Sequence, residues 1–308
     1  MIFARVLQVV VLLVVLAGCS RVQFAYNQLD WVIPEYLETY VDFSEEQRVA
    51  LDDKVDALLN WNCSTQVATY AAMLRSANKD FQSGTMSKER LEEYRVQLEG
   101  HWRAIMSQAS PGIADVLVTL SDEQVDGVFA VFKDKNEEWL EDFEDETDEE
   151  RRDRYRERMT DELERWLGPL GWTQQRAVLD WSNRLIPLGL LGLQARQQWQ
   201  ANLQEVMGNR DDEAAFRAGI EELFVNARAL RAPAIQERFE ENRVLGLDLI
   251  QTVGADLNDD QRTHLASEVA SVAGDLDELV CDPEPPTARK QEDNGTGGSP
   301  PEDARSDS

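Results

Sequence analysis

The sequence is poor in the residues that most catalytic and metal sites use. Its 308 residues include two histidines, His101 and His264, and three cysteines. Neither histidine lies in an H-E-x-x-H or E-x-x-H arrangement or near a cysteine at metal-ligand spacing. No G-x-S-x-G, P-loop or G-x-G-x-x-G pattern occurs. The sequence therefore predicts no metal, no cofactor and no catalytic residue, and it disfavours serine hydrolases and nucleotide-binding enzymes.

Positive charge is also scarce. Lysine and arginine number 31 against 59 aspartates and glutamates, which gives a formal net charge of −28. Such a surface repels nucleic acid and favours cationic partners. The acidic run 141–158 lacks the spaced Asp/Asn and glycine pattern of a calcium loop. We interpret it as a solvated helix with ion pairs such as Asp148–Arg152 and Glu150–Arg154.

Alternating strand patterns are absent, whereas apolar residues at helical spacing run along most of the chain. The sequence predicts an all-α multi-helix bundle of about eight to ten helices over residues 31–281. Ser110 and Pro111 are expected to start one helix, and the helix from Leu120 can extend to Leu167. Residues 282–308 lack apolar content and are predicted to be a disordered acidic tail.

The N-terminus contains the long apolar run that the rest of the chain lacks. Residues 1–18 have one early charge, an apolar stretch and small residues at the end, as in a signal peptide. Leu16-Ala17-Gly18-Cys19 matches a lipobox, which predicts cleavage between Gly18 and Cys19 and acyl chains such as palmitate on Cys19. Residues 19–30 would be the lipidated tether. The alternative is an ordinary signal peptide followed by an incidental cysteine.

Lipidation at Cys19 places the protein on a bacterial membrane outside the cytosol. Ser20 favours the periplasmic face of the outer membrane, and the inner membrane remains an alternative. Cys63 and Cys281 are then left in an oxidising compartment, where they are expected to pair. Such a disulfide would close a long loop and contribute about 4–5 kcal/mol in the chain-entropy model. The alternative is two buried free thiols.

A five-residue pattern recurs as FSEEQ (43–47), LSDEQ (120–124), WTQQR (172–176) and LNDDQ (257–261). In three copies a Ser or Asn stands three residues before a Gln, which is the spacing of a helix capping box. In the fourth copy, Thr173 has Arg176 at this position. The pattern therefore predicts helix starts rather than a ligand site, with cap pairs Ser44 and Gln47, Ser121 and Gln124, and Asn258 and Gln261.

The pentad resembles the LTxxQ signature of Spy/CpxP-type periplasmic chaperones over five residues at a time. A longer stretch resembles an uncharacterised proteobacterial lipoprotein family, which has a lipobox cysteine, a Y-N-x-x-D-W segment and a Y-V-D-L-T-x-x-Q segment. The matching positions are Cys19, then Tyr26, Asn27, Asp30 and Trp31, then Tyr40, Val41, Asp42, Phe43, Ser44 and Gln47. The resemblance implies a helical envelope protein and no particular activity.

These observations favour a lipid-anchored, periplasm-facing binding protein without catalysis. It would bind an unidentified protein or polypeptide partner in a chaperone-like manner. One alternative is a scaffolding subunit of an envelope complex, and another is a cell-wall glycan hydrolase built on paired carboxylates. Most of the eight tryptophans, and the segment LIPLGLLGL (185–193), are expected to be buried in the core.

Overall fold

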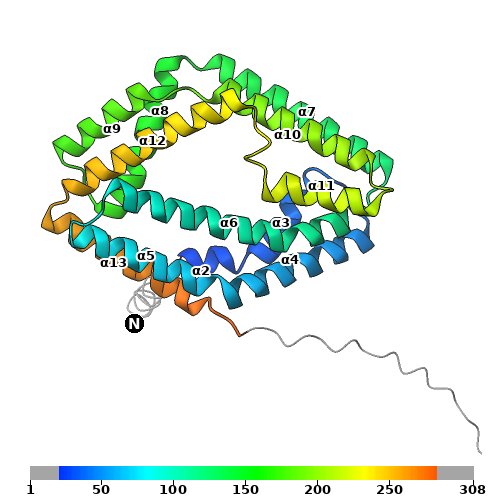
Figure 1. Ribbon diagram of the computed structural model, residues 1–308, viewed down its shortest axis with the longest axis horizontal. Coiled ribbons are helices and arrows are strands. Elements are labelled where there is room, and N and C mark those ends of the chain that lie inside the picture. Colours follow the sequence, from blue (N-terminus) through cyan, green and yellow to red (C-terminus); the bar gives the residue numbers. More distant parts are fainter. Residues whose placement is uncertain (1–20, 283–308) are drawn as a thin grey trace, which may run out of the picture.

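The computed structural model describes residues 21–282 and contains helices but no strand within that range (Figure 1). This confirms the all-α class, while the twelve helices described exceed the eight to ten expected. The helices are α2 (Arg21–Tyr26), α3 (Leu29–Glu38), α4 (Glu45–Thr65), α5 (Val67–Gln82), α6 (Lys88–Leu117), α7 (Asp122–Asp145), α8 (Asp148–Leu167), α9 (Trp172–Arg184), α10 (Gly189–Gly208), α11 (Glu213–Val225), α12 (Pro233–Ala255) and α13 (Asp259–Glu278).

Two features account for the larger number of helices. Helix is present ahead of Trp31 within the described residues, because residues 21–30 of the expected tether form α2 and the start of α3. The segment expected to be one helix up to Leu167 is divided into α7 and α8 by a further capping box, in which Thr147 accepts from the backbone of Glu150. Glu150 therefore serves the cap rather than pairing with Arg154, whose partner is Glu146 at 2.5 Å.

The expectation that Pro111 starts a helix is wrong, because α6 continues through it. A proline inside a helix removes the hydrogen bond to the carbonyl four residues earlier, here that of Ser107. The hydroxyl of buried Ser110 donates to the Ser107 carbonyl oxygen at 3.4 Å and restores a partner for it. The serine that would have capped a new helix instead compensates for the proline within a continuous one.

The helices together form a ring, with α6 and α12 on opposite sides of its centre (Figure 1). Its apolar side chains form three separate clusters rather than one central core. The first joins α5, α8, α9, α12 and α13, the second joins α6, α7, α10 and α11, and the third joins α3, α4 and the end of α6. The apolar cores therefore lie within the walls of the ring.

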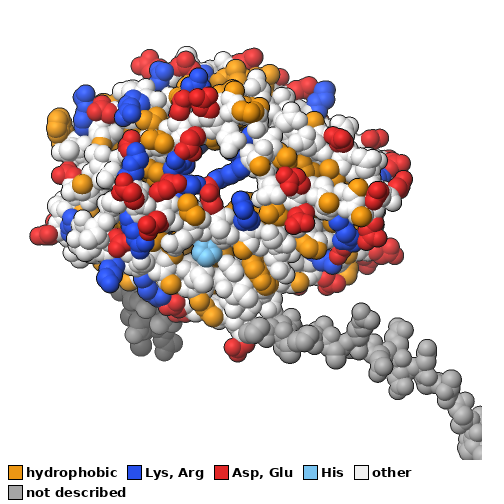
Figure 2. Space-filling model, in the orientation of Figure 1, with side chains coloured by type: hydrophobic (Ala, Val, Ile, Leu, Met, Phe, Trp, Pro, Cys, Tyr) orange, Lys and Arg blue, Asp and Glu red, His pale blue; other side chains and the backbone are white. Residues whose placement is uncertain are grey.

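The centre of the ring is polar. Figure 2 shows this face hollowed at its middle, with lysine, arginine, aspartate and glutamate side chains around the hollow. Ion pairs link α6 to α12 there: Lys88 Nζ lies 2.5 Å from Asp248 Oδ1, and Arg243 pairs with Glu92. A third pair, Arg228–Glu99, ties the segment between α11 and α12 to α6. Partly exposed pairs of this kind contribute little stability individually, so the packed walls maintain the ring.

Candidate functional site

The capping boxes at the starts of α4 and α7 face each other. In each box the serine hydroxyl accepts the glutamine backbone N–H at 3.2 Å, and the glutamine Oε1 accepts the serine backbone N–H at 2.9 Å. The two glutamine side chains also bond each other. Gln47 Nε2 donates to Gln124 Oε1 at 3.1 Å, and Gln124 Nε2 donates to Gln47 Oε1 at 2.7 Å. We call this pair the first glutamine clasp.

A second glutamine clasp joins the starts of α9 and α13. Gln174 Nε2 donates to Gln261 Oε1 at 3.0 Å, and the reverse bond is 2.8 Å long. Both side chains are almost fully buried, at 1% and 3% exposed. The box at α13 is formed by Asn258 and Gln261, as the sequence predicts.

In the fourth copy of the pentad, the helix cap lies two residues before the expected position. The N-cap of α9 is Gly171, whose backbone N–H donates to Gln174 Oε1 at 2.9 Å. Thr173 and Arg176 are not the cap pair. Glycine has no side-chain oxygen, so half of the usual box is missing, and a search for Ser, Thr or Asn at the cap position overlooks it. Gln174, three residues after Gly171, is the signal that could have revealed it.

Each clasp also binds the loop before the opposite helix. The remaining glutamine N–H groups donate to carbonyl oxygens two residues before the partner cap: Thr119 and Asp42 in the first clasp, Pro169 and Asp256 in the second. The amide groups are thus occupied within the protein. The recurring pentad is a structural joint between distant helix starts rather than a ligand site.

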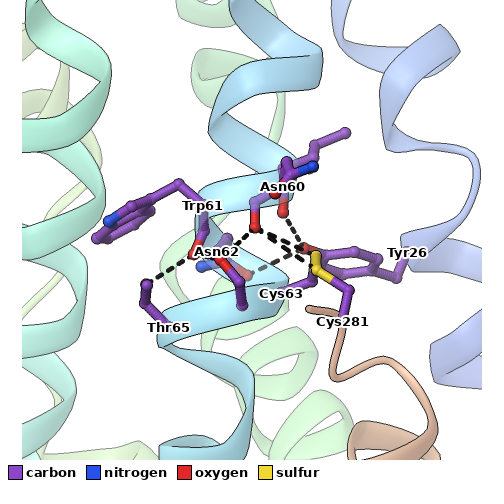
Figure 3. Close-up of a disulfide and its surroundings, with 9 residues drawn as sticks. Tyr26, Asn60, Trp61, Asn62, Cys63, Thr65 and Cys281 are labelled. Carbon is purple, nitrogen blue, oxygen red and sulfur yellow. Dashed lines mark hydrogen bonds between the residues drawn. A yellow bond between two sulfur atoms is a disulfide. The ribbon is translucent and has the colours of Figure 1, made fainter. Parts of the chain in front are cut away.

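The structure joins Cys63, near the end of α4, to Cys281, just after α13, in a disulfide with 5.3 Å between the Cα atoms. Tyr26 of α2 lies beside it (Figure 3). The Tyr26 hydroxyl donates to Leu59 O and to Asn62 Oδ1, both at 3.1 Å. Burial, with a smaller contribution from Tyr70, raises the pKa of Tyr26 to about 12. The disulfide and Tyr26 together fasten the N-terminal helices to the body.

Several predicted features lie outside the described residues. These are the lipidation and cleavage positions Gly18 and Cys19, the signal peptide 1–18, and the tail from residue 283 onward. Across residues 21–282, no helix is long and apolar enough to cross a membrane. Over the same range, no group of three or more His, Cys, Asp or Glu side chains is placed to hold a metal ion. His101 contacts Gln66 Oε1, and His264 contacts the Arg165 carbonyl oxygen.

A groove of about 340 Å³ runs between α7 and α10. Two buried amides lie at its floor, where Asn136 Nδ2 donates to Gln200 Oε1 at 2.8 Å. The other polar atom of Asn136, Oδ1, is buried and has no hydrogen-bond partner among the described residues. A buried acceptor without a donor costs about 1–3 kcal/mol. The lining residues are Phe129, Phe132, Lys133, Asn136, Glu137, Leu140, Leu193, Gln197, Gln200, Ala201 and Gln204.

The groove combines apolar and polar chemistry. Phe129 and Phe132 meet edge to face with ring centroids 5.8 Å apart and supply an apolar wall. Gln197 and Gln204 are exposed along the α10 side, so their amides can donate and accept hydrogen bonds. The two charged lining residues, Lys133 and Glu137, lie one turn apart on α7 and form an ion pair at 3.2 Å. The groove therefore fits an extended segment with apolar side chains and backbone amide groups.

A second cavity, of about 220 Å³, lies within the first apolar cluster between α5, α8, α12 and α13. Leu74, Phe81, Trp166 and Ile250 are among its lining residues, and Asn78 supplies the amide on its wall. Compared with the α7/α10 groove, it offers little hydrogen-bonding capacity to orient a ligand. The α7/α10 groove is therefore the stronger candidate for a binding site.

The molecule is thus an all-helical protein whose candidate site is a groove between two helices. A family model described as a family of unknown function, DUF6279, matches residues 39–235. The chain therefore belongs to this family, which confirms the expectation of an uncharacterised family. No curated protein and no solved structure gave a significant match.

Proposed function

We propose that this protein is a lipid-anchored, periplasm-facing binding protein that holds segments of other polypeptides in the α7/α10 groove and catalyses no reaction. The observation that carries the proposal is the groove itself, where the phenylalanine wall of α7 lies beside the exposed amides of Gln197 and Gln204 on α10. A polypeptide segment offers both apolar side chains and backbone amide groups, so it can bind to both parts of such a groove.

The composition of the groove supports a polypeptide as ligand. The phenylalanine wall can contact apolar side chains, and the glutamine amides of α10 can pair with backbone amide groups of an extended segment. The net charge of −28 attracts cationic segments over a distance of about 8–10 Å at ordinary ionic strength. Binding should therefore weaken as the salt concentration rises.

The same groove serves the alternative role of a scaffolding subunit with one dedicated partner. The distinction lies in selectivity: a chaperone-like protein binds many unfolded chains, whereas a scaffold binds one. A glycan hydrolase would need two carboxylates facing each other at about 5–9.5 Å. Glu137 is the carboxylate among the residues that line the groove.

The test is suppression of aggregation of an unrelated cationic, unfolded protein at stoichiometric concentration. Ala201 is an exposed lining residue, so Ala201→Trp should fill the groove without disturbing the core. Ala130 is exposed on α7 and is not a lining residue, so Ala130→Trp is the matched control. We expect suppression by the wild type and Ala130→Trp, and at least a fivefold loss in Ala201→Trp. Equal activity of the two variants would contradict the groove as the binding site.

The anchor has a separate test. Labelled palmitate should be incorporated into the wild-type chain and not into Cys19→Ala, and the labelled chain should partition into detergent. Recovery of a chain with intact Met1 from the cytosolic fraction would contradict the lipoprotein assignment. A gentle detergent extraction followed by crosslinking would then identify whether one partner or many clients accompany the protein.

A further inference from the structure

Exposed apolar side chains concentrate in the first two described helices. Of the twelve large apolar residues that are well exposed in the described chain, four lie in α2 and α3, and three of these are aromatic. Phe24 is 70% exposed, Trp31 58% and Tyr36 59%, and Val32 completes the set. We call these four residues the aromatic face. The expectation that the tryptophans are mainly core residues fails at Trp31, and also at Trp102 and Trp172.

The opposite sides of these helices are fixed to the body. Ile33 and Leu37 pack against the cluster formed by Leu51 and Val55 of α4. Tyr26 is bonded to α4, and α2 also contacts α13. The four exposed residues therefore lie on helices that other side chains hold against the body, so they can contact a surface without refolding.

We propose that the aromatic face of α2 and α3 lies in the headgroup region of a zwitterionic phospholipid bilayer and sets the orientation of the ring on the membrane. This inference rests on the proposed acylation of Cys19. Arg21 begins α2 two residues after Cys19. Two residues span at most about 7 Å, so an acylated Cys19 requires the start of α2 to lie at the bilayer surface.

The residue types agree with this location. Tryptophan and tyrosine are enriched at membrane–water interfaces because their rings are apolar and carry one polar group. The Tyr36 hydroxyl already has a partner, the Tyr40 hydroxyl at 3.0 Å. Residues 21–38 contain one arginine and three acids (Asp30, Glu35 and Glu38), which disfavours anionic lipid. Binding to the bilayer must therefore come from burial of apolar side chains, which a zwitterionic surface does not oppose.

The test uses the acylated protein reconstituted into phosphatidylcholine vesicles that contain bromine-labelled lipid, a quencher of tryptophan fluorescence. The labelled vesicles should quench the wild type and Trp172→Phe, and quenching should fall clearly in Trp31→Phe. Trp172 is 79% exposed at the start of α9, far along the chain from the aromatic face, so it is the matched control. Equal quenching in the Trp31→Phe variant and the wild type would overturn the proposal.

A mature chain that lacks acyl groups tests the aromatic face independently of the lipid anchor. It should partition weakly onto the same vesicles, and Trp31→Lys should weaken partitioning about tenfold relative to Trp172→Lys, as expected for the loss of one buried aromatic side chain. Acylated protein that floats with vesicles while Trp31 stays unquenched would retain the anchor and reject the aromatic face. If the chain purified from the cell envelope carries no acyl group and still shows the Trp31-dependent partitioning, the result would support the face and reject the anchor.

Discussion

Gln47 and Gln124 exchange side-chain amide hydrogen bonds in both directions, although 77 residues separate them in the chain. Each glutamine also accepts the backbone N–H of its own helix cap. One side chain therefore stabilises a helix start and the contact between two helix starts. The equivalent relation between Gln174 and Gln261 spans 87 residues. The two clasps hold together parts of the ring that local sequence cannot connect.

Replacing a clasp glutamine by glutamate should destabilise the fold. Gln124→Glu removes the amide that donates to Gln47 and to the Asp42 carbonyl and leaves two acceptors facing a carboxylate. The expected loss is about 1–3 kcal/mol in the free energy of unfolding. Gln261→Glu should cost more because Gln261 is buried. Urea denaturation measures both, and Gln194→Glu on the exposed surface of α10 is the control.

The disulfide should contribute substantially to stability. Cys63 and Cys281 are 218 residues apart, and for a loop of this length the chain-entropy model gives about 5 kcal/mol. We expect reductant to lower the thermal midpoint of the wild type and to leave that of the Cys63→Ser, Cys281→Ser double variant unchanged. A wild-type midpoint insensitive to reductant would contradict the prediction.

Replacing the buried amides Asn136 and Gln200 should change both the stability of the fold and the binding of polypeptides. Asn136→Leu alone leaves Gln200 Oε1 without its donor and should cost about 1–3 kcal/mol. The double variant Asn136→Leu, Gln200→Leu leaves no unpaired amide at this position, so its stability should equal or exceed that of the wild type. Aggregation suppression should fall in both. A double variant that binds normally would show that these amides serve packing alone.

Acid should weaken the joint between α5 and α6. The Asp80 carboxylate accepts from the Tyr94 hydroxyl and from Arg90 Nε, both at 2.6 Å. The hydrogen bond from Tyr94, followed by the one from Arg90, holds the pKa of Asp80 below its ordinary value of 3.8. Its stabilising contribution is therefore fully present above about pH 4 and is lost as the pH falls through the lower pKa of the folded protein.

The measurement is the urea midpoint at pH 7 and at pH 3. The wild type should lose more stability between these values than Asp80→Asn, which has no carboxylate to protonate at this position. Asp134→Asn, on the exposed side of α7, should lose as much as the wild type. Equal losses of stability in the wild type and Asp80→Asn would show that Asp80 does not contribute to the acid sensitivity.

The sequence predicts local features better than long-range ones. The helix starts at Ser44, Ser121 and Asn258 follow from cap spacing because the capping box is completed within four residues. The pairing of the caps depends on tertiary contacts, so the pattern alone could not reveal the clasps. Pro111 shows the same limit: it favours a helix start locally, but packing keeps α6 continuous.

The candidate groove lay beyond sequence prediction for a related reason. Asn136 and Gln200 come from different helices, and each stands among residues typical of an exposed helix surface. Their burial depends on how α7 and α10 pack. The disulfide was easier to predict, since only two cysteines remain once Cys19 is assigned to the lipid.

The bond between Cys63 and Cys281 has a topological consequence. It turns the polypeptide from α4 to α13 into one closed covalent circle that contains the groove and the second clasp. A protease that cuts this circle once opens it without releasing a fragment, so nicked protein should run as a single species until a reductant is added.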